Sequence, residues 1–240
     1  MAPLVILPTY DEAENIANVL ERTRKAVPEA QVLGVDDGSP DGTADLAEQA
    51  GERLGGVHVL RREGKSGLGS AYRAGFRWGL DQGYDVLVEM DADLSHDPDD
   101  LPALLAAVTH GADLAIGSRY VPGGSVPDWS WHRRMLSRWG NRYAAGVLGL
   151  AVNDATAGFR AYRSSMLEAI DLDTIVADGY GFQIEMTYQV VGLGGRIVEV
   201  PISFSDRLLG ESKMSGRIVT EALGLVTWWA VRDRLLPSGR

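Results

Sequence analysis

A regular alternation of short apolar runs and amphipathic segments limits most strongly how this chain can fold. Each β-branched or apolar run in the first half of the chain is followed by apolar residues at helical spacing. The predicted strands are residues 4–7, 31–35, 57–60, 84–88 and 114–116. Strands that alternate with helices form a largely parallel sheet covered by helices. We therefore expect one α/β domain, for which 240 residues supply an ample core.

Polar residues follow the predicted strands at their carboxyl ends, which is where open α/β sheets bind ligands. Asp36 and Asp37 come directly after the second strand, in a turn-rich stretch that runs to Thr43. Two acidic residues exceed what a turn requires, so a ligand with hydroxyl or ring N–H donors would explain them, although capping alone could account for one. Residues 61–69 form a basic, glycine-rich loop that suits phosphate, but their spacing does not match a P-loop.

Asp91 and Asp93 are the most informative of these polar residues. Both follow a predicted strand, and residues i and i+2 of an extended segment point to the same side. Two such carboxylates repel each other unless a divalent cation binds, and oxygen ligands favour Mg²⁺ or Mn²⁺. The alternative is an acidic loop that only caps the next helix, since Asp97 suits an N-cap and Pro98 the first helical position. The strand context favours the metal site.

Several other charged residues allow both a structural and a functional interpretation. Asp11 and Glu14 have the spacing of a capping box, which predicts that the first helix begins in this stretch. Glu185, on a helix predicted to begin near residue 179, is either an acid near the site or a structural partner for an arginine. Arg133 and Arg134 lie at the start of a helix predicted over residues 132–150, where solvent exposure is the simpler interpretation.

Residues 216–236 form a predicted helix that is unusually apolar for the protein surface. Glu221 is its only charged residue between Arg217 and Arg232, and Trp228 and Trp229 lie side by side in its sequence. Such a helix packs on the domain, lies in a membrane interface or docks a partner. The predicted organisation is thus a main domain over residues 1–215 and an apolar helix over residues 216–240.

Charge and composition argue against several classes of protein. The net charge of −10 opposes nucleic-acid binding, which requires a basic surface. The lack of cysteine rules out disulfides and thiolate metal sites. The N-terminus lacks the pattern of a signal peptide, and no apolar run reaches the roughly 20 residues of a membrane span. These features predict a cytoplasmic location.

A series of short motifs extends over almost the whole chain. They are residues 8–12 (Pro-Thr-Tyr-Asp-Glu), 36–43, 65–69, 90–96 (with Asp-Ala-Asp), 117–120, 158–160, 181–186, and 200–204 with 206–207 and 210–213. Together these motifs resemble those of family 2 glycosyltransferases of GT-A fold, and most closely those of polyprenol (dolichol) phosphate mannose synthases. The first two motifs and the Asp-x-Asp occur widely among sugar transferases, whereas the last two are more particular to the mannose synthases.

The resemblance implies an inverting transfer of mannose from GDP-mannose to a polyprenyl monophosphate, with Mg²⁺ or Mn²⁺ as cofactor. The motif positions then assign the site residues. The nucleoside site is matched by Pro8, Tyr10, Glu12, Val35 and Asp37, and the metal and diphosphate site by Asp91, Asp93 and Ser95, with Ala92 between the acids. The cations around the two phosphates are matched by Arg119, Arg207, Lys213 and, less closely, Arg133. Asp91, Asp93, Arg119 and Arg207 are the implied catalytic residues.

The resemblance also bears on attachment to the membrane. Self-anchored members of the family carry transmembrane helices after the catalytic domain, whereas this sequence ends at Arg240. The chain is therefore expected to be peripheral at the inner face of the membrane. The membrane surface or a membrane-embedded partner protein would hold it there.

Two alternatives remain open at this stage. A polyprenyl-phosphate glucose synthase that uses UDP-glucose would share most of these motifs. A non-catalytic binding subunit of GT-A fold would not need Asp91, Asp93, Arg119 and Arg207.

The acceptor also decides whether the enzyme needs a catalytic base, because a phosphate monoester has a second pKa near 6 and is already anionic at pH 7. A sugar hydroxyl would instead require a general base, for which Glu185 is the residue to test.

Overall fold

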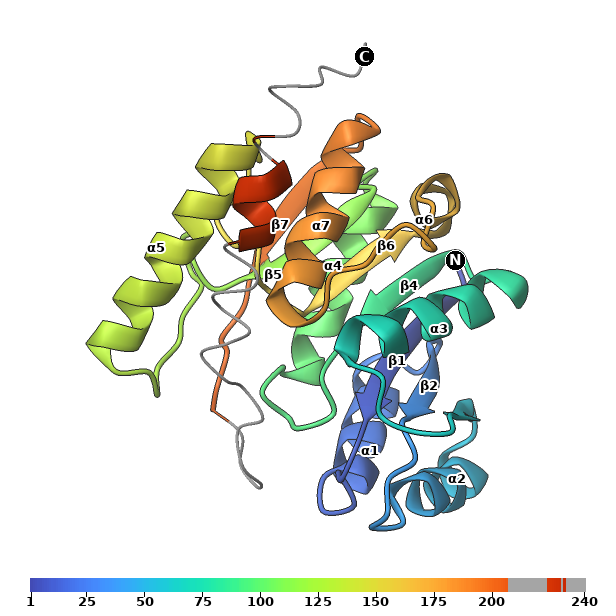
Figure 1. Cartoon of the computed structure of the whole chain (residues 1–240). Helices are drawn as coiled ribbons and strands as arrows, with labels where there is room; N and C mark the ends of the chain where they lie inside the picture. The colour runs from blue at the N-terminus through green and yellow to red at the C-terminus, as the bar shows by residue number, and fades with distance from the viewer. Residues whose placement is uncertain (207–223, 230, 232–240) are drawn as a thin grey trace.

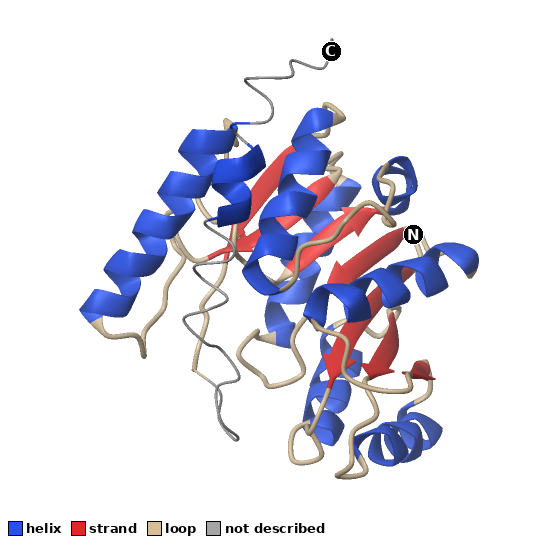
Figure 2. Ribbon diagram, viewed as in Figure 1, coloured by secondary structure: helices blue, strands red, loops and turns tan. Residues whose placement is uncertain are grey.

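The structure is a computed structural model that describes residues 1–206, 224–229 and 231. One central sheet runs through the molecule, and helices cover both of its faces (Figures 1 and 2). Arg207, Lys213 and most of the predicted C-terminal helix lie outside the described residues.

The described sheet has seven strands in the order β3-β2-β1-β4-β6-β5-β7. The strands are β1 (Pro3–Thr9), β2 (Gln31–Asp36), β3 (Val57–Arg61), β4 (Val86–Glu89), β5 (Leu114–Ser118), β6 (Arg160–Arg163) and β7 (Ile197–Pro201). All neighbouring pairs are parallel except those that β6 forms with β4 and β5. The predicted mostly parallel sheet is therefore confirmed, with one reversed strand near its middle.

The helices fill the connections between these strands. They are α1 (Ile16–Ala26), α2 (Thr43–Leu54), α3 (Leu68–Asp81), the 3₁₀ turn η1 (Pro98–Asp100), α4 (Leu101–Thr109), α5 (Trp131–Leu148), α6 (Ser164–Ala169) and α7 (Gly179–Gly192). The turn η1 begins as predicted, because the Asp97 carboxylate accepts a hydrogen bond from the Asp99 amide at 3.0 Å and Pro98 follows it.

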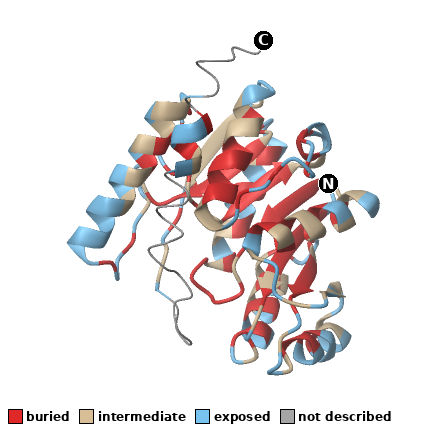
Figure 3. Cartoon of the chain, in the orientation of Figure 1, coloured by how far each residue is buried: buried red, intermediate tan, exposed pale blue. Residues whose placement is uncertain are grey.

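Alternate side chains of β1 belong to two core clusters, one on each face of the sheet. Leu4 and Ile6 join a cluster with residues of α3 and α7, whereas Val5 and Leu7 join a second cluster with residues of α1, α2 and α4. Successive side chains of a strand point to opposite faces, so a strand covered on both sides is apolar throughout. Figure 3 shows the buried colour concentrated on the sheet and on the inner sides of these helices.

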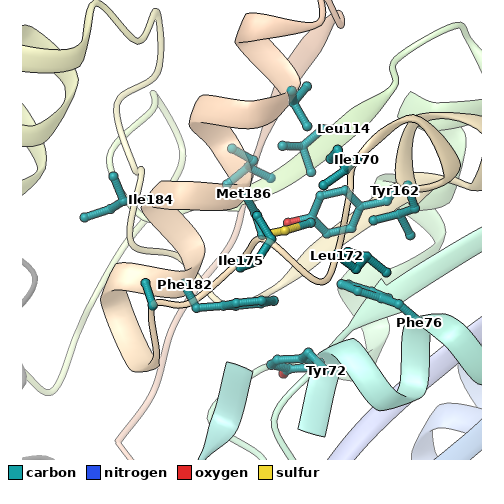
Figure 4. Close-up of a cluster of buried hydrophobic side chains, with 14 of the residues drawn as sticks. Tyr72, Phe76, Leu114, Tyr162, Ile170, Leu172, Ile175, Phe182, Ile184 and Met186 are labelled. Atoms are coloured by element: carbon teal, nitrogen blue, oxygen red, sulfur yellow. The ribbon is translucent and has the colours of Figure 1, made fainter. Parts of the chain in front are cut away.

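Aromatic side chains hold α3 and α7 together over the first of these faces (Figure 4). Tyr72 of α3 stacks on Phe182 of α7, with ring centroids 6.0 Å apart. Phe76 meets the ring of Tyr162 edge-on at 5.4 Å. Such pairs contribute roughly 0.5–1.5 kcal/mol beyond their buried area. The first pair fixes α7 against α3, and the second fixes α3 against β6. The first residues of α3 and α7 line the cavity described below.

The capping box predicted at Asp11 and Glu14 is wrong. The helix α1 begins at Ile16, its N-cap Asn15 makes no side-chain capping bond, and Asp11 has a left-handed backbone with φ of 54°. The amides of this stretch are bonded instead by a second loop: Glu12 N donates to Thr43 Oγ1 at 2.9 Å, and Ala13 N donates to an Asp41 carboxylate oxygen at 3.0 Å. Contacts between loops thus replace a local cap.

The described part of the C-terminal segment is helical over residues 224–229. Trp229 is buried and stacks on Tyr188, whereas Trp228 is 62% exposed. Thr227 bonds the hydroxyl of Tyr143, which ties this segment to α5. Only one of the two tryptophans is therefore available to a membrane or a partner. None of the described helices combines the length and the apolar character that a membrane span requires.

Candidate functional site

A cavity of about 460 Å³ opens at the carboxyl ends of β1, β2, β4 and β5. Residues that follow these strands form much of its wall, and the first residues of α7 close another side. The residues predicted from the sequence that line it are Pro8, Tyr10, Glu12, Asp37, Asp91, Ala92, Asp93, Arg119 and Arg133. The structure thus brings together most of the predicted site.

Val35 and Ser95 are predicted site residues that the structure does not bring to the cavity wall. Val35 lies within β2, and the pleat of the strand directs its side chain into the core below α3. The hydroxyl of Ser95 is buried, and its backbone amide donates to an Asp93 carboxylate oxygen at 3.0 Å. Ser95 therefore shapes the acidic loop from behind.

Asp36 and Asp37, which follow β2, have different environments. Both oxygens of Asp36 accept bonds from Ser39, and one also accepts the Thr9 hydroxyl at 3.0 Å. Asp36 is thus explained by the turn alone. Asp37 lines the cavity, forms an ion pair with Arg62 at 2.9 Å and accepts the Ser66 amide at 3.2 Å. Asp37 therefore joins the loop after β2 to the basic glycine-rich loop.

Lys65 of the glycine-rich loop reaches over this same side of the cavity. Its ammonium group lies 4.4 Å from the centre of the Tyr10 ring, and both residues line the cavity. A cation above an aromatic ring is attracted by the charge distribution of the ring. This part of the wall therefore offers an aromatic surface, a point charge and the Asp37 carboxylate to a ligand.

Asp91 and Asp93 form the acidic side of the cavity, in a tight turn where Leu94 has φ of 62°. The Asp91 side chain is 34% exposed toward the cavity, and Asp93 is buried. The Asp91 amide donates to His96 Nδ1 at 3.1 Å. Burial lowers the pKa of His96, so the neutral ring that accepts this bond is favoured.

The acidic corner formed by Asp91 and Asp93 has the chemistry that a hard divalent cation requires. Its donors are carboxylate oxygens, which suit Mg²⁺ and Mn²⁺. The part of the chain that the structure describes contains no group of three or more histidine, cysteine or acidic residues that could enclose a metal by itself. Mg²⁺ typically binds through one or two carboxylates together with substrate phosphates, and Asp91 and Asp93 match that pattern.

Arg119, directly after β5, is the buried cation of the cavity. Its guanidinium group bonds both oxygens of Asp154, with Nε and Nη2 each at 2.7 Å from their acceptors. Burial alone would lower the pKa of Arg119, but the Asp154 carboxylate outweighs it and raises the pKa above the usual value. Arg119 therefore stays charged and firmly held.

Arg133 at the start of α5 is a second cation on this side. Its guanidinium lies 4.0 Å from the centre of the Trp129 ring and pairs with Asp206 at 2.9 Å. Trp129 also donates its indole N–H to Asp206 at 3.0 Å. Arg134 is exposed on α5 and does not line the cavity, as expected for a solvated residue.

A buried carboxyl group lies beneath the acidic corner. Glu89, at the end of β4, is fully buried, and one of its oxygens accepts from the Gln183 side chain at 2.7 Å. Burial raises the pKa of Glu89 to about 7, against the opposing charge of Arg160. Gln183 lines the cavity, so it connects this buried group to the wall.

Glu185 does not line the cavity. It is buried, and one carboxylate oxygen accepts a hydrogen bond from the Ala177 amide at 3.0 Å. This carboxylate therefore organises the loop before α7, which is the structural interpretation, with a backbone amide as the identified partner.

Several cavity residues were not predicted from the sequence. Trp129, His96, Asp178 and Tyr180 all line the cavity. Asp178 accepts from the Gly69 amide at 2.6 Å and so links the start of α3 to the start of α7. Asp178 precedes the glycine-rich start of a predicted helix, where an N-cap signal was available. His96 lies within the motif of residues 90–96, so its place there was an available signal, whereas nothing in the sequence marked Trp129 or Tyr180 as a site residue.

Comparison with known proteins identifies close relatives. The family model described as Glycosyl transferase family 2 matches residues 4–171. An undecaprenyl-phosphate mannosyltransferase of Micrococcus luteus is 57% identical over 98% of this chain and 96% of its own length. A polyprenol monophosphomannose synthase of Mycolicibacterium smegmatis is 53% identical over 97% of this chain and 88% of its own length.

A solved structure supports the fold. Glucosyl-3-phosphoglycerate synthase of Mycobacterium tuberculosis, in complex with Mn²⁺, UDP and glucosyl-3-phosphoglycerate, superposes with a TM-score of 0.64. It is 21% identical in sequence, and the match covers 98% of this chain and 78% of that chain. At this level of identity the likeness shows the shared GT-A fold.

Proposed function

The chain belongs to glycosyl transferase family 2, and on that premise we propose that it moves mannose from GDP-mannose to a polyprenyl monophosphate. The products are polyprenyl phosphate mannose and GDP, with inversion at the sugar carbon. One observation carries the proposal: Asp91 and Asp93 line the same cavity as Arg119 and Arg133. The names of the two bacterial relatives support the same sugar and the same class of acceptor.

The donor is proposed to bind along the loops after β1 and β2. Tyr10 offers a ring face, Lys65 a charge above it, and Asp37 a carboxylate that can accept from the N–H groups of guanine. Glu12 also lines this side. The diphosphate would then lie toward Asp91 and Asp93, which are the residues that would hold Mg²⁺ or Mn²⁺. A metal held there would supply positive charge against the negative charge that develops on the departing diphosphate.

The acceptor is proposed to bind on the arginine side. An acceptor phosphate is already anionic at pH 7, so it attacks the sugar carbon without first losing a proton to a base. The protein has to align two phosphate groups, and the planar guanidinium fork suits that task. Glu185, the acid proposed for testing as a base, is turned toward the Ala177 amide. Both features support a phosphate nucleophile.

The activity is tested by incubating purified protein with radiolabelled GDP-mannose and undecaprenyl phosphate in the presence of Mg²⁺. We expect label in the lipid phase and none when the acceptor is a non-phosphorylated polyprenol. UDP-glucose in place of GDP-mannose distinguishes the glucose synthase, and calorimetric titration with GDP and UDP measures the base preference. A protein that binds GDP but transfers no sugar would be the non-catalytic subunit.

The chain is also proposed to lie against the inner face of the membrane through α5. The large apolar residues Trp131, Met135, Leu136 and Trp139 are each more than half exposed, and three of them recur at four-residue spacing. Figure 3 shows the first half of α5 in the exposed colour. The helix contains four arginines and no acidic residue, in a protein of net charge −10. Aromatic and basic side chains together suit an anionic bilayer surface.

Co-sedimentation with vesicles tests this surface. Wild-type protein is expected to bind vesicles that contain phosphatidylglycerol and to bind neutral vesicles less. Replacing Trp131 and Trp139 by serine should weaken the binding. The matched control is Leu46→Ser, an exposed leucine on α2, which should leave it unchanged. Equal binding of all three proteins would contradict the proposed surface.

A further inference from the structure

Asp154 lies behind Arg119, on the side away from the cavity. It is fully buried and does not line the cavity, whereas Arg119 does. One Asp154 oxygen accepts from both the Arg119 backbone amide at 3.0 Å and Nε at 2.7 Å, and the other accepts from Nη2 at 2.7 Å. The carboxylate therefore fixes both the backbone and the side chain of a single residue.

Thr156 completes this arrangement. Its hydroxyl accepts a second bond from Nη2 of Arg119 at 2.9 Å. A guanidinium group has five N–H donors, so Asp154 and Thr156 together use Nε and both hydrogens of Nη2. Within the described residues, the hydrogen bonds of the guanidinium group involve these two nitrogens and not Nη1. The two N–H groups on Nη1 are thus the ones left for an anion in the cavity.

Aromatic rings and a second carboxylate restrict the arrangement further. The guanidinium carbon lies 5.5 Å from the centres of the Tyr120 and Trp129 rings and 5.6 Å from that of Phe204. Asp154 is itself tethered, because its amide donates to Glu199 on β7 at 3.0 Å. Asp154 is therefore tethered to β7, and Arg119 directly follows β5, its neighbour in the sheet.

A contribution to stability does not explain this pair. Removing two charges from water costs so much that a buried ion pair is often no better than apolar residues of the same volume. A solvated arginine would attract phosphate equally well by charge, but it would have to be ordered each time the ligand binds. What the buried pair supplies is a guanidinium group whose direction is set in advance.

We propose that Asp154 is a positioning residue, which orients Arg119 so that its two Nη1 N–H groups point to the phosphate groups between which mannose is transferred. The inference rests on the proposed function, because it presumes a phosphate ligand at this end of the cavity. Arg119 remains charged without Asp154. Loss of the Asp154 carboxylate should therefore disturb the alignment of the guanidinium group with the phosphates more than its attraction for them. A displacement of about 1 Å in such a group can lower a rate about 10²-fold.

The test compares Asp154→Asn, Arg119→Ala and the double variant with the wild type, by steady-state mannosyl transfer. We expect Asp154→Asn to lower kcat about 10²-fold, with the KM of each substrate changed less than about threefold. In the Arg119→Ala background, Asp154→Asn should add less than about a twofold loss, because its only partner in catalysis is gone. If the loss of kcat in the double variant instead equals the product of the two single losses, the inference is overturned.

Asp113→Asn is the matched control. Asp113 forms an ion pair with Arg163 at 3.4 Å in the same sheet and does not line the cavity. It should keep the wild-type kcat. An equal loss of kcat in Asp113→Asn would mean that any broken ion pair in the sheet has this effect, and it would overturn the role of Asp154.

Nuclear magnetic resonance of the wild-type protein with ¹⁵N-labelled arginine gives a second test that does not require a variant of Asp154 to fold. Arg119, identified by its absence in Arg119→Lys, should give separate, slowly exchanging Nε and Nη signals. Exposed Arg134 in the same spectrum should give averaged ones. Averaged signals for Arg119 would overturn the inference. A wild type that transfers no mannose would refute the proposed function, whereas an active wild type whose Asp154→Asn variant keeps its kcat would refute this role alone.

Discussion

Replacing Glu89 by glutamine tests whether the carboxyl group beneath the cavity carries a proton in the folded protein. Glu89 is fully buried, and the Gln183 side chain donates to one of its oxygens at 2.7 Å. Burial raises its pKa from 4.5 to about 7, although Arg160 and Gln183 oppose the rise. A difference of one in pKa between the folded and unfolded states corresponds to about 1.36 kcal/mol. The rise therefore corresponds to roughly 3 kcal/mol of pH-dependent stability.

The sign follows from which state binds the proton more tightly. The folded protein does, so the stabilisation is fully present below pH 4.5 and is lost as the pH rises to about 7. Glutamine resembles the protonated carboxyl group and can still accept from Gln183, so the variant should lack this dependence. Relative to Glu89→Gln, the wild type should therefore lose roughly 3 kcal/mol between pH 4.5 and pH 8.

Urea unfolding of both proteins at several pH values between 4.5 and 8 provides the measurement. Subtracting one profile from the other removes the contribution of every other titrating group, and Glu168→Gln, an exposed glutamate on α6, serves as the control. A difference between wild type and Glu89→Gln that stays constant within about 0.5 kcal/mol, the usual scatter of such extrapolations, would refute the reasoning.

Three further outcomes are expected. Activity should require Mg²⁺ or Mn²⁺ and collapse in Asp91→Asn, and full activity in EDTA would contradict this. Arg207→Ala should lower the single-turnover rate at saturating donor far more than Glu185→Gln; if Glu185→Gln abolishes the chemistry while both substrates still bind, a base is required and the phosphate acceptor is wrong. Gly79→Ala should destabilise the fold by about 1–3 kcal/mol in thermal unfolding, because the added Cβ would lie 2.5 Å from a methyl group of Leu87. An unchanged Tm would contradict this and would show that the neighbouring side chains move to accept the methyl group.

The sheet and most of the cavity wall were predictable because both depend on local pattern. Short apolar and β-branched runs identified the first five strands, and the helical spacing of apolar residues identified the helices between them. Asp37 and Asp91 were found because each comes after a predicted strand, where a parallel sheet gathers its ligand contacts, whereas Arg119 was found through the resemblance of its motif. For Asp37 and Asp91, a place just beyond the end of a strand was the signal that pointed to this cavity.

What escaped prediction depends on contacts between distant segments. The first helix starts late because the loop of residues 39–43 bonds the amides of Asp11, Glu12 and Ala13 and so replaces a local cap. Val35 was assigned to the site by motif position, but its place within a strand turns it into the core. The burial of Trp229 beside exposed Trp228 likewise depends on Tyr188, which lies on α7. For the first helix and for Trp229, the partner is too far along the chain for spacing to reveal it.

The reversed strand β6 has a consequence for synthesis on the ribosome. β1 to β4 pair with one another, so this part of the sheet can form once residue 89 has emerged. β5 ends at residue 118, but its partners in the sheet are β6, which ends at residue 163, and β7, which comes later still. The 45 residues between those ends take roughly 2–9 s to add at about 5–20 residues per second. During that interval the nascent chain carries a mostly apolar strand, buried in the folded protein, with both edges open, which gives a chaperone reason to hold β5.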